Sequence, residues 1–212
     1  GPKSFSLMEK VFGSKIKDLK FFKFDFFNFQ NNKFLISRSG YSKQGGYEIH
    51  IEDVKAGQKL YDYLFQIGKD FDLKPGCPNH IERIEGGLLS YGNDMDIGDN
   101  PLECGFDRYV NLETDVMFLG KESLKKIKKD GIKKKLMGVK IDAQSIILTK
   151  SLPLTHNNEK VGEIRSSAFS PKFGKVVGIA MIKKEFCNNL QKFQLVFDNK
   201  IYKGEVCDLP IN

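Results

Sequence analysis

The residues with the clearest chemical potential lie in the stretch RSGYSKQGGYEIHIED, residues 38–53. Gly40, Gly45 and Gly46 stand just ahead of Glu48, which opens an alternating apolar run. Glycine has no Cβ, so the backbone can approach a neighbouring group closely, and a carboxylate accepts two parallel N–H donors. The stretch therefore fits a loop that presents a carboxylate to a ligand. From these residues alone, a solvent-facing strand glutamate is the simpler interpretation.

Three further side chains near Glu48 are candidate ligand contacts. Tyr41 could hold a cationic group over its ring, although it fits a core tyrosine equally well. His50 falls on the same strand face as Glu48 because strand side chains alternate, and an ordinary surface histidine has the same pattern. Phe22, in the preceding aromatic run, fits either a pocket wall or a core position.

The other polar residues argue against several kinds of site. Four cysteines and three histidines are scattered without a CxxC pair, so we expect reduced, mostly buried thiols and no metal. The net charge of +7 arises after residue 120, around a lysine-rich run at 121–135. The run lacks interleaved aromatic residues for base stacking, which predicts a solvated helix face and no nucleic-acid partner. No run of about 18 apolar residues occurs, so we expect no membrane partner.

Helices and strands alternate before residue 130. Helical spacing of apolar residues predicts helices over 5–12 and 56–70. A further short helix is expected over 80–85, ending at Gly86 and Gly87. Strand patterns predict three strands, over 21–29, 34–36 and 47–51, with a turn at 30–33. Ser4 is the expected N-cap of the first helix. The aromatic run at 21–29 predicts a strand buried on much of both faces.

From about residue 133 the pattern changes to short apolar strands separated by polar turns. The predicted strands cover 136–141, 161–166, 176–182, 193–197 and 201–206. Five or six short strands in 80 residues indicate a small closed barrel, and the lysine-rich helix at 121–131 is the natural connector. The predicted fold class is therefore α+β, with one domain over residues 1–130 and a β-barrel domain over 131–212.

Five segments carry a resemblance to a known family. They are RSGYSKQGGYEI (38–49), RIEGGLLSYGNDMD (83–96), NPLECGFDRYV (100–110), FLGKESLKK (118–126) and VGEIRSSAFSPKFGKVVGIAMI (161–182). In this order they resemble motifs of the glycine cleavage T-protein, or aminomethyltransferase, family. The resemblance implies part of a folate-binding domain followed by an antiparallel C-terminal barrel.

The resemblance also implies a role for the glycine-rich loop. Tetrahydrofolate becomes the expected co-substrate, and Glu48 matches the family glutamate that pairs with the N–H donors on one edge of the pterin. Gly45 and Gly46 would let the backbone pass close to that ring. No acid–base or nucleophilic constellation can be assembled from the remaining residues, so the catalytic residues are not predicted.

Within the family, four segments are similar to those of folate-dependent dimethylsulfoniopropionate demethylases: SKQGGYE, PNHIERIE, ECGFD and CDLP. The similarity implies transfer of a methyl group from dimethylsulfoniopropionate to tetrahydrofolate, giving 5-methyltetrahydrofolate and methylmercaptopropionate. Two departures from the T-protein motifs favour this small-molecule donor: Asn79 replaces an arginine and Arg108 replaces a tryptophan. Tyr41 instead follows the T-protein pattern.

Other members of the family leave alternatives open. An aminomethyltransferase would need a lipoyl carrier protein as its partner, and the chain could also be the folate-binding part of a sarcosine or dimethylglycine dehydrogenase. A non-catalytic folate-binding protein of the iron–sulfur assembly type is disfavoured, because Gly40 stands where that signature has cysteine. We expect the C-terminal part of a longer cytoplasmic enzyme, inactive by itself. The sequence does not predict the oligomeric state.

Overall fold

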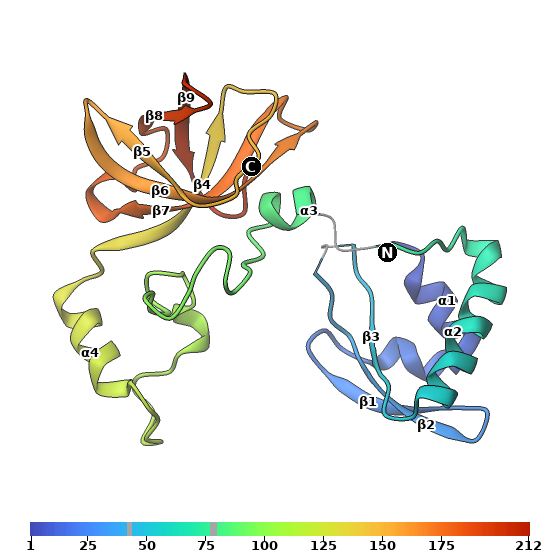
Figure 1. Ribbon diagram of the computed structural model, residues 1–212. Coiled ribbons are helices and arrows are strands. Elements are labelled where there is room, and N and C mark those ends of the chain that lie inside the picture. The colour runs from blue at the N-terminus through green and yellow to red at the C-terminus, as the bar shows by residue number, and fades with distance from the viewer. Residues whose placement is uncertain (42–43, 77–79) are drawn as a thin grey trace. The chain divides into compact units, whose positions relative to one another are not determined.

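A computed structural model describes residues 1–41, 44–76 and 80–212 of the chain. The chain divides into two compact units, residues 1–79 and 80–212, called here the N-terminal and C-terminal units (Figure 1). Neither unit ends at the domain boundary that the sequence predicts near residue 130, and that boundary stays a prediction.

The N-terminal unit is a three-stranded antiparallel sheet with two helices. Its strands, in the order β1-β2-β3, are β1 (Phe24–Phe29), β2 (Asn32–Ser37) and β3 (Glu48–His50). Its helices are α1 (Ser4–Phe12) and α2 (Val54–Gly68), with short 3-10 turns η1 (Ser14–Asp18) and η2 (Lys69–Phe71). Gln30 and Asn31 have positive φ angles of 46° and 63°, as a two-residue hairpin turn requires. The predicted helices, hairpin and third strand are confirmed, with ends shifted by a few residues.

Local capping explains how these helices begin and end. The carboxylate of Asp53 accepts hydrogen bonds from the backbone N–H groups of Lys55 and Ala56 and so caps α2. Gly13, with φ 81°, ends α1. The prediction that Ser4 caps α1 is wrong, because the helix already includes Ser4 and its buried Oγ has no hydrogen-bond partner in the described part of the chain.

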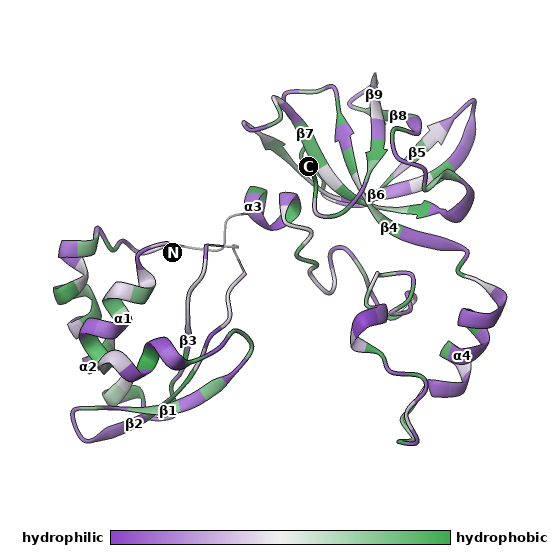
Figure 2. Cartoon of the chain, turned by 180° about the vertical axis from the view of Figure 1, so that it is seen from behind, coloured by the Kyte–Doolittle hydropathy of each residue, from purple (hydrophilic) through white to green (hydrophobic). Residues whose placement is uncertain are grey.

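One face of the sheet packs on α1 and α2, and the other does not. Phe27 and Phe29 are buried in the core cluster shared with the helices, whereas Phe24 and Phe26 on the opposite face are 65% and 45% exposed. The prediction that residues 21–29 form one strand buried on both faces is therefore wrong. The aromatic run gave no sign that the two helices cover a single face. Figure 2 shows hydrophobic and hydrophilic segments alternating along both helices, as expected for helices packed on one side.

The C-terminal unit contains a closed antiparallel barrel, as predicted. Its strands are β4 (Lys134–Ile141), β5 (Leu152–His156), β6 (Glu159–Ser170), β7 (Lys175–Lys183), β8 (Lys192–Phe197) and β9 (Lys200–Cys207). They close in the order β4-β7-β6-β5-β8-β9, with β4 pairing both β7 and β9. The alternating inward residues, such as Val139, Leu154 and Ile164, are fully buried.

Strand β5 is absent from the sequence prediction because it contains Pro153, and proline removes a ladder donor. In the structure Pro153 lies opposite Glu163 of β6. The pairing of β5 with β8 starts only at Leu154, so the missing N–H of Pro153 falls outside that second ladder.

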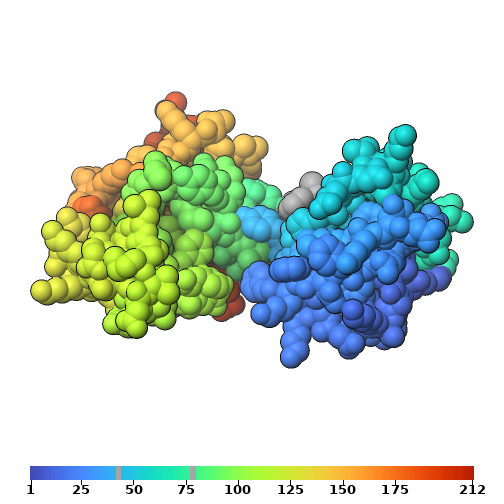
Figure 3. Space-filling view, turned by 90° about the horizontal axis from the view of Figure 1, so that it is seen from below, coloured from blue at the N-terminus to red at the C-terminus, as the bar shows by residue number. Residues whose placement is uncertain are grey.

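The rest of the C-terminal unit consists of short helices joined by loops. These are α3 (His80–Glu85), α4 (Lys121–Asp130), η3 (Asp107–Tyr109) and η4 (Lys184–Phe186). Helix α4 is largely hydrophilic and lies at the surface (Figures 2 and 3), as predicted for the lysine-rich run. Lys121 is an exception: it is buried and its Nζ donates hydrogen bonds to the backbone carbonyls of Thr114 and Val116.

The described cysteines are free thiols, as expected for a reduced protein. Cys104 and Cys207 are buried and Cys187 is half-buried. Burial raises the pKa of Cys104 and of Cys207 to about 11, so both remain protonated thiols at neutral pH. Cys77, the fourth, lies outside the described residues together with Pro78 and Asn79.

Candidate functional site

Four of the six predicted contact residues border one cavity of the N-terminal unit. Tyr41, Gly45, Gly46 and Glu48 line a cavity of about 430 Å³ next to the start of β3. Residues 42 and 43, which complete the glycine-rich loop, lie outside the described residues. The structure thus brings the predicted carboxylate, two glycines and aromatic ring to one place.

The other two predicted residues, His50 and Phe22, are not among the described residues that line this cavity. His50 lies opposite Leu35 and Glu48 lies opposite Ser37 in the same strand pairing, so both side chains occupy the same sheet face. Phe22 precedes β1, has a left-handed φ of 59° and is 69% exposed. Their roles as ligand contacts stay predictions.

The walls of the cavity are mostly apolar. Leu7 and Met8 come from α1, Leu64 and Phe65 from α2, and Leu73 from the segment after it. The sequence predicted both helices but not that they wall this cavity. A signal existed, since Leu64 continues the i, i+4 stripe of α2 toward its C-terminal end. The cavity therefore combines apolar walls with a single carboxylate.

Glu48 is held by hydroxyl groups. Ser39 Oγ donates a hydrogen bond to Glu48 Oε2, and Ser37 Oγ lies 3.1 Å from Ser39 Oγ. No cation forms an ion pair with Glu48 in the described ranges. A carboxylate has about four acceptor positions, so one serine hydroxyl leaves capacity for further N–H donors. Neither serine could be identified as a contact of Glu48 from the sequence.

Gly45 is required by the protein's own packing. Its φ is 73°, and a Cβ at this position would lie 2.9 Å from a ring carbon of Phe5. Gly46 has φ 145°, and its nearest neighbour, the carbonyl oxygen of Ser39, would lie 3.7 Å from a Cβ. Gly45 therefore allows the loop to pack on α1, while a Cβ at Gly46 would make only an ordinary van der Waals contact.

Phe5 and Arg38 anchor the base of the loop. The guanidinium of Arg38 lies 4.7 Å from the centre of the Phe5 ring, and its Nη1 donates to the carbonyl of Leu19 at 3.0 Å. The ring of Tyr47 meets Phe5 edge-on at 5.5 Å, and burial raises the pKa of the Tyr47 hydroxyl. The segment that carries Glu48 is thus fixed on both sides by aromatic contacts.

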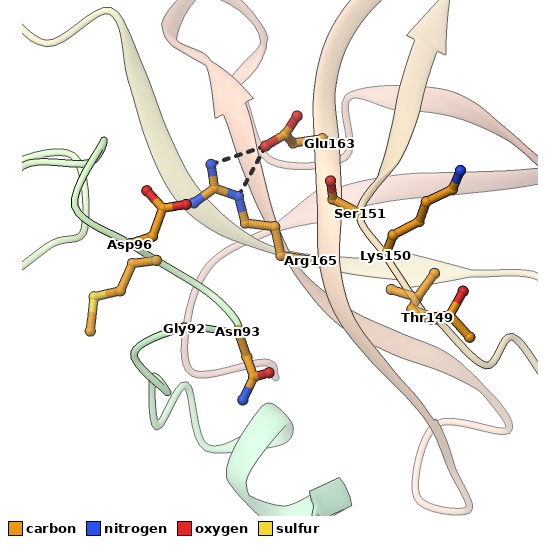
Figure 4. A pocket seen from close by; sticks show the side chains of 10 residues that line it. Gly92, Asn93, Asp96, Thr149, Lys150, Ser151, Glu163 and Arg165 are labelled. Carbon is orange, nitrogen blue, oxygen red and sulfur yellow. Dashed lines mark hydrogen bonds and ion pairs between the residues drawn. The ribbon is translucent and has the colours of Figure 1, made fainter.

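A second cavity, of about 300 Å³, lies in the C-terminal unit and is strongly polar (Figure 4). Arg165 donates from Nε and Nη2 to Glu163 Oε1 at 3.1 and 3.0 Å. It donates from Nη1 to Asp99 Oδ2 at 2.5 Å and to the backbone carbonyl of Asp94 at 2.9 Å, and from Nη2 to Asp99 Oδ1 at 3.4 Å. All five guanidinium N–H groups are therefore engaged within the protein. Lys150 points away from the guanidinium in Figure 4.

The charges beneath this cavity neutralise one another. Burial opposes the ionisation of Asp99, but hydrogen bonds from Arg165 and Lys134 outweigh it and lower the pKa of Asp99 to about 2. Nearby, Arg83 donates to Asp94 Oδ2 at 2.6 Å and to Ser166 Oγ at 2.9 Å, and all three side chains are buried. These contacts indicate a structural network that ties the loop around residues 90–99 to the barrel.

Within residues 1–41, 44–76 and 80–212, no group of three or more His, Cys, Asp or Glu side chains is arranged to hold a metal ion. None of the helices in those ranges is both long and apolar enough to cross a membrane.

Both halves of the chain match known domain families. Residues 1–114 match the family described as the GCVT N-terminal domain, and residues 134–211 match the glycine cleavage T-protein C-terminal barrel domain. The chain is also similar to the crystal structure of the glycine cleavage system aminomethyltransferase T from Bartonella henselae, with a TM-score of 0.84 at 20% identity. The similarity covers 100% of this chain and 58% of that chain, and it shows a shared fold.

Two curated proteins illustrate the range of relatives. The dimethylsulfoniopropionate demethylase DmdA of Ruegeria pomeroyi is 38% identical over 184 residues, which are 87% of this chain and 50% of that protein. An aminomethyltransferase of Halothermothrix orenii is 31% identical over 213 residues, which are 99% of this chain and 58% of that protein. The chain thus spans about half the length of the curated relatives it matches.

Proposed function

The chain belongs to the glycine cleavage T-protein family, and we propose that it carries the folate site of an enzyme that transfers a methyl group from dimethylsulfoniopropionate to tetrahydrofolate. The observation that carries the proposal is the mostly apolar cavity that Glu48 borders at the start of β3, with no cationic partner for its carboxylate among the described residues. The 38% identity to the Ruegeria demethylase supports the choice of methyl donor. A cytoplasmic location is part of the proposal.

The cavity has the chemistry that a pterin requires. A pterin presents a ring N–H beside an amino group, and a carboxylate meets two such parallel donors best. Flat rings gain by leaving water for apolar walls, here Leu7, Met8 and Leu64. In this proposal Glu48 recognises the pterin edge, Gly46 lets the backbone pass close to the ring and Tyr41 faces the donor.

The proposed reaction needs little acid–base chemistry. Tetrahydrofolate supplies a nucleophilic nitrogen that bonds to the methyl carbon while the C–S bond breaks, its electron pair going to sulfur, and the nitrogen's proton leaves to solvent. A sulfonium is already an activated methyl donor, so the protein contributes positioning and exclusion of water. The apolar walls and the fixed carboxylate serve those two purposes. No side chain is assigned a proton-transfer role.

An aminomethyltransferase is the second candidate. Two observations favour it: Tyr41 keeps the tyrosine of the T-protein motif, and the Halothermothrix aminomethyltransferase aligns over 99% of the chain. This enzyme would take its one-carbon unit from a lipoyl carrier protein and would share the folate site. The two candidates therefore differ in the donor and not in the role of Glu48.

The donor is tested by supplying the full-length gene product with tetrahydrofolate and each donor in turn. The proposal predicts that dimethylsulfoniopropionate yields methylmercaptopropionate and 5-methyltetrahydrofolate, detected by chromatography, with no glycine-cleavage activity on addition of a lipoyl carrier. The reverse pattern would exclude the demethylase and leave the folate site in place. Activity with neither donor would exclude both candidates.

A further inference from the structure

The contact that Ser39 makes with Glu48 could not be predicted from its place in the sequence. It follows strand β2 directly, and its Oγ donates to Oε2 of Glu48 nine residues later. Ser37, at the end of β2, lies opposite Glu48 in the strand pairing and places its own Oγ 3.1 Å from that of Ser39. The three side chains thus form a chain of polar contacts that runs from the end of β2 to the cavity, which Ser39 and Glu48 both line.

The direction of these hydrogen bonds follows from the number of protons. A serine hydroxyl has one hydrogen, and an ionised carboxylate can only accept. Ser39 therefore uses its one hydroxyl hydrogen in the hydrogen bond to Glu48. The hydrogen bond between the two serines must then be donated by Ser37. Hydrogen bonds linked in one direction strengthen one another, so Ser37 supports the contact that Ser39 makes.

The backbone at Ser39 is fixed by contacts that involve no ligand. Its neighbour Arg38 donates its N–H to the carbonyl of Lys23 at 2.9 Å and accepts from the N–H of Phe22 at 2.9 Å. The guanidinium of Arg38 is held over Phe5 and bonded to Leu19. The backbone next to Ser39 is therefore held in place by the protein itself.

We propose that Ser39 is a positioning residue, which fixes the orientation of the Glu48 carboxylate so that its remaining acceptor positions face the ligand. The inference rests on the proposed function, in which Glu48 pairs with the pterin edge. The terminal torsion of a glutamate is broad and poorly restrained on its own, and Glu48 is an exposed side chain. Orienting it in advance removes part of the ordering that binding would otherwise require.

The test is a set of variants of the full-length gene product, titrated calorimetrically with tetrahydrofolate. Ser39→Ala should weaken binding about three- to tenfold, Ser39→Thr should restore it by keeping the hydroxyl, and Ser37→Ala should have a smaller effect. Ser170→Ala is the matched control, because Ser170 Oγ makes the same kind of bond, 2.6 Å, to Oε1 of Glu85 in the C-terminal unit. It should leave the affinity unchanged. Melting temperatures report any loss of folding.

A double-mutant cycle separates this inference from the proposed function. If Ser39 acts through Glu48, Ser39→Ala should have no further effect on affinity in a Glu48→Ala background, which has no side-chain acceptor. Equal effects in both backgrounds, or failure of Ser39→Thr to restore binding, would overturn the inference. So would wild-type affinity in Ser39→Ala when Glu48→Gln is weakened. Unchanged affinity in Glu48→Gln would instead overturn the proposed folate site itself.

Discussion

Two sets of carboxylates, one around Arg165 and one beside the apolar cavity, have opposite surroundings. In the C-terminal unit, Glu163 and Asp99 are paired with Arg165, and every N–H of that guanidinium is used. In the N-terminal unit, Glu48 receives a serine hydroxyl and has no cationic partner among the described residues. The walls differ as well, being polar in the first case and mostly apolar in the second.

The difference separates structural charge from charge available to a ligand. A buried carboxylate that is fully paired contributes to the fold, and removing its partner leaves a buried charge without compensation. A carboxylate held by a neutral donor keeps both its negative charge and most of its acceptor positions. The comparison predicts that changes in the polar cavity affect stability, whereas changes at Glu48 affect binding.

The largest effect on stability is expected from Asp94→Ala. This change leaves the guanidinium of Arg83 buried without its 2.6 Å partner, which should lower the free energy of unfolding by about 3–5 kcal/mol. Urea denaturation followed by circular dichroism measures the change. Asp142→Ala is the control, since Asp142 pairs with Lys175 at the surface and should change stability by less than about 1 kcal/mol. Equal effects would contradict a structural role for the buried network.

A smaller effect is expected from acid. The pKa of Asp99 is about 2 in the folded chain, against an ordinary value of 3.8, so the folded state favours the ionised form. Its contribution, about 2 kcal/mol, is present above pH 4 and is lost as the pH falls from about 4 to 2. The free energy of unfolding, measured by denaturation between pH 5 and 2.5, should therefore fall less steeply with falling pH for Asp99→Asn than for the unchanged protein. Parallel curves would show that Asp99 ionises normally in the folded state.

Gly45→Ala should have a smaller effect and destabilise the N-terminal unit by about 1–2 kcal/mol, because an L-residue is strained at φ 73°. The new Cβ would also press on the Phe5 ring. Gly174→Ala separates the two causes, since Gly174 has φ 61° but open space around it. A larger loss at Gly45, measured by thermal denaturation, would report the contact with Phe5. Equal losses would show that Phe5 does not constrain the loop.

The sequence predicted the elements better than their surroundings. Helices over 5–12 and 56–70 and five barrel strands followed from the pattern of apolar residues, which is a local property. The burial of the aromatic run at 21–29 was wrong, because covering one face or two depends on where helices pack. Strand β5 was missed because Pro153 lacks the N–H donor expected of a strand residue, although the register of β5 in the barrel accommodates the proline.

The candidate site shows the same division. The glycines and Glu48 could be identified because glycines just ahead of a glutamate fit a loop that presents a carboxylate to a ligand. Ser39 and Ser37 could not, because a serine hydroxyl near a strand end is common and only the pairing of β2 with β3 brings it to Glu48. Lys121 is similar: a lysine-rich run predicts solvent, and only the loop carbonyls that its ammonium contacts explain its burial.

The central claim is that Glu48 recognises tetrahydrofolate, and calorimetric titration of the full-length gene product tests it most directly. Glu48→Gln should weaken tetrahydrofolate binding at least tenfold, about 1.4 kcal/mol, with little change in melting temperature. Glu163→Gln, a matched change in the polar cavity, should leave the affinity unchanged. Unaltered affinity in Glu48→Gln, or an equal loss in both variants, would contradict the account.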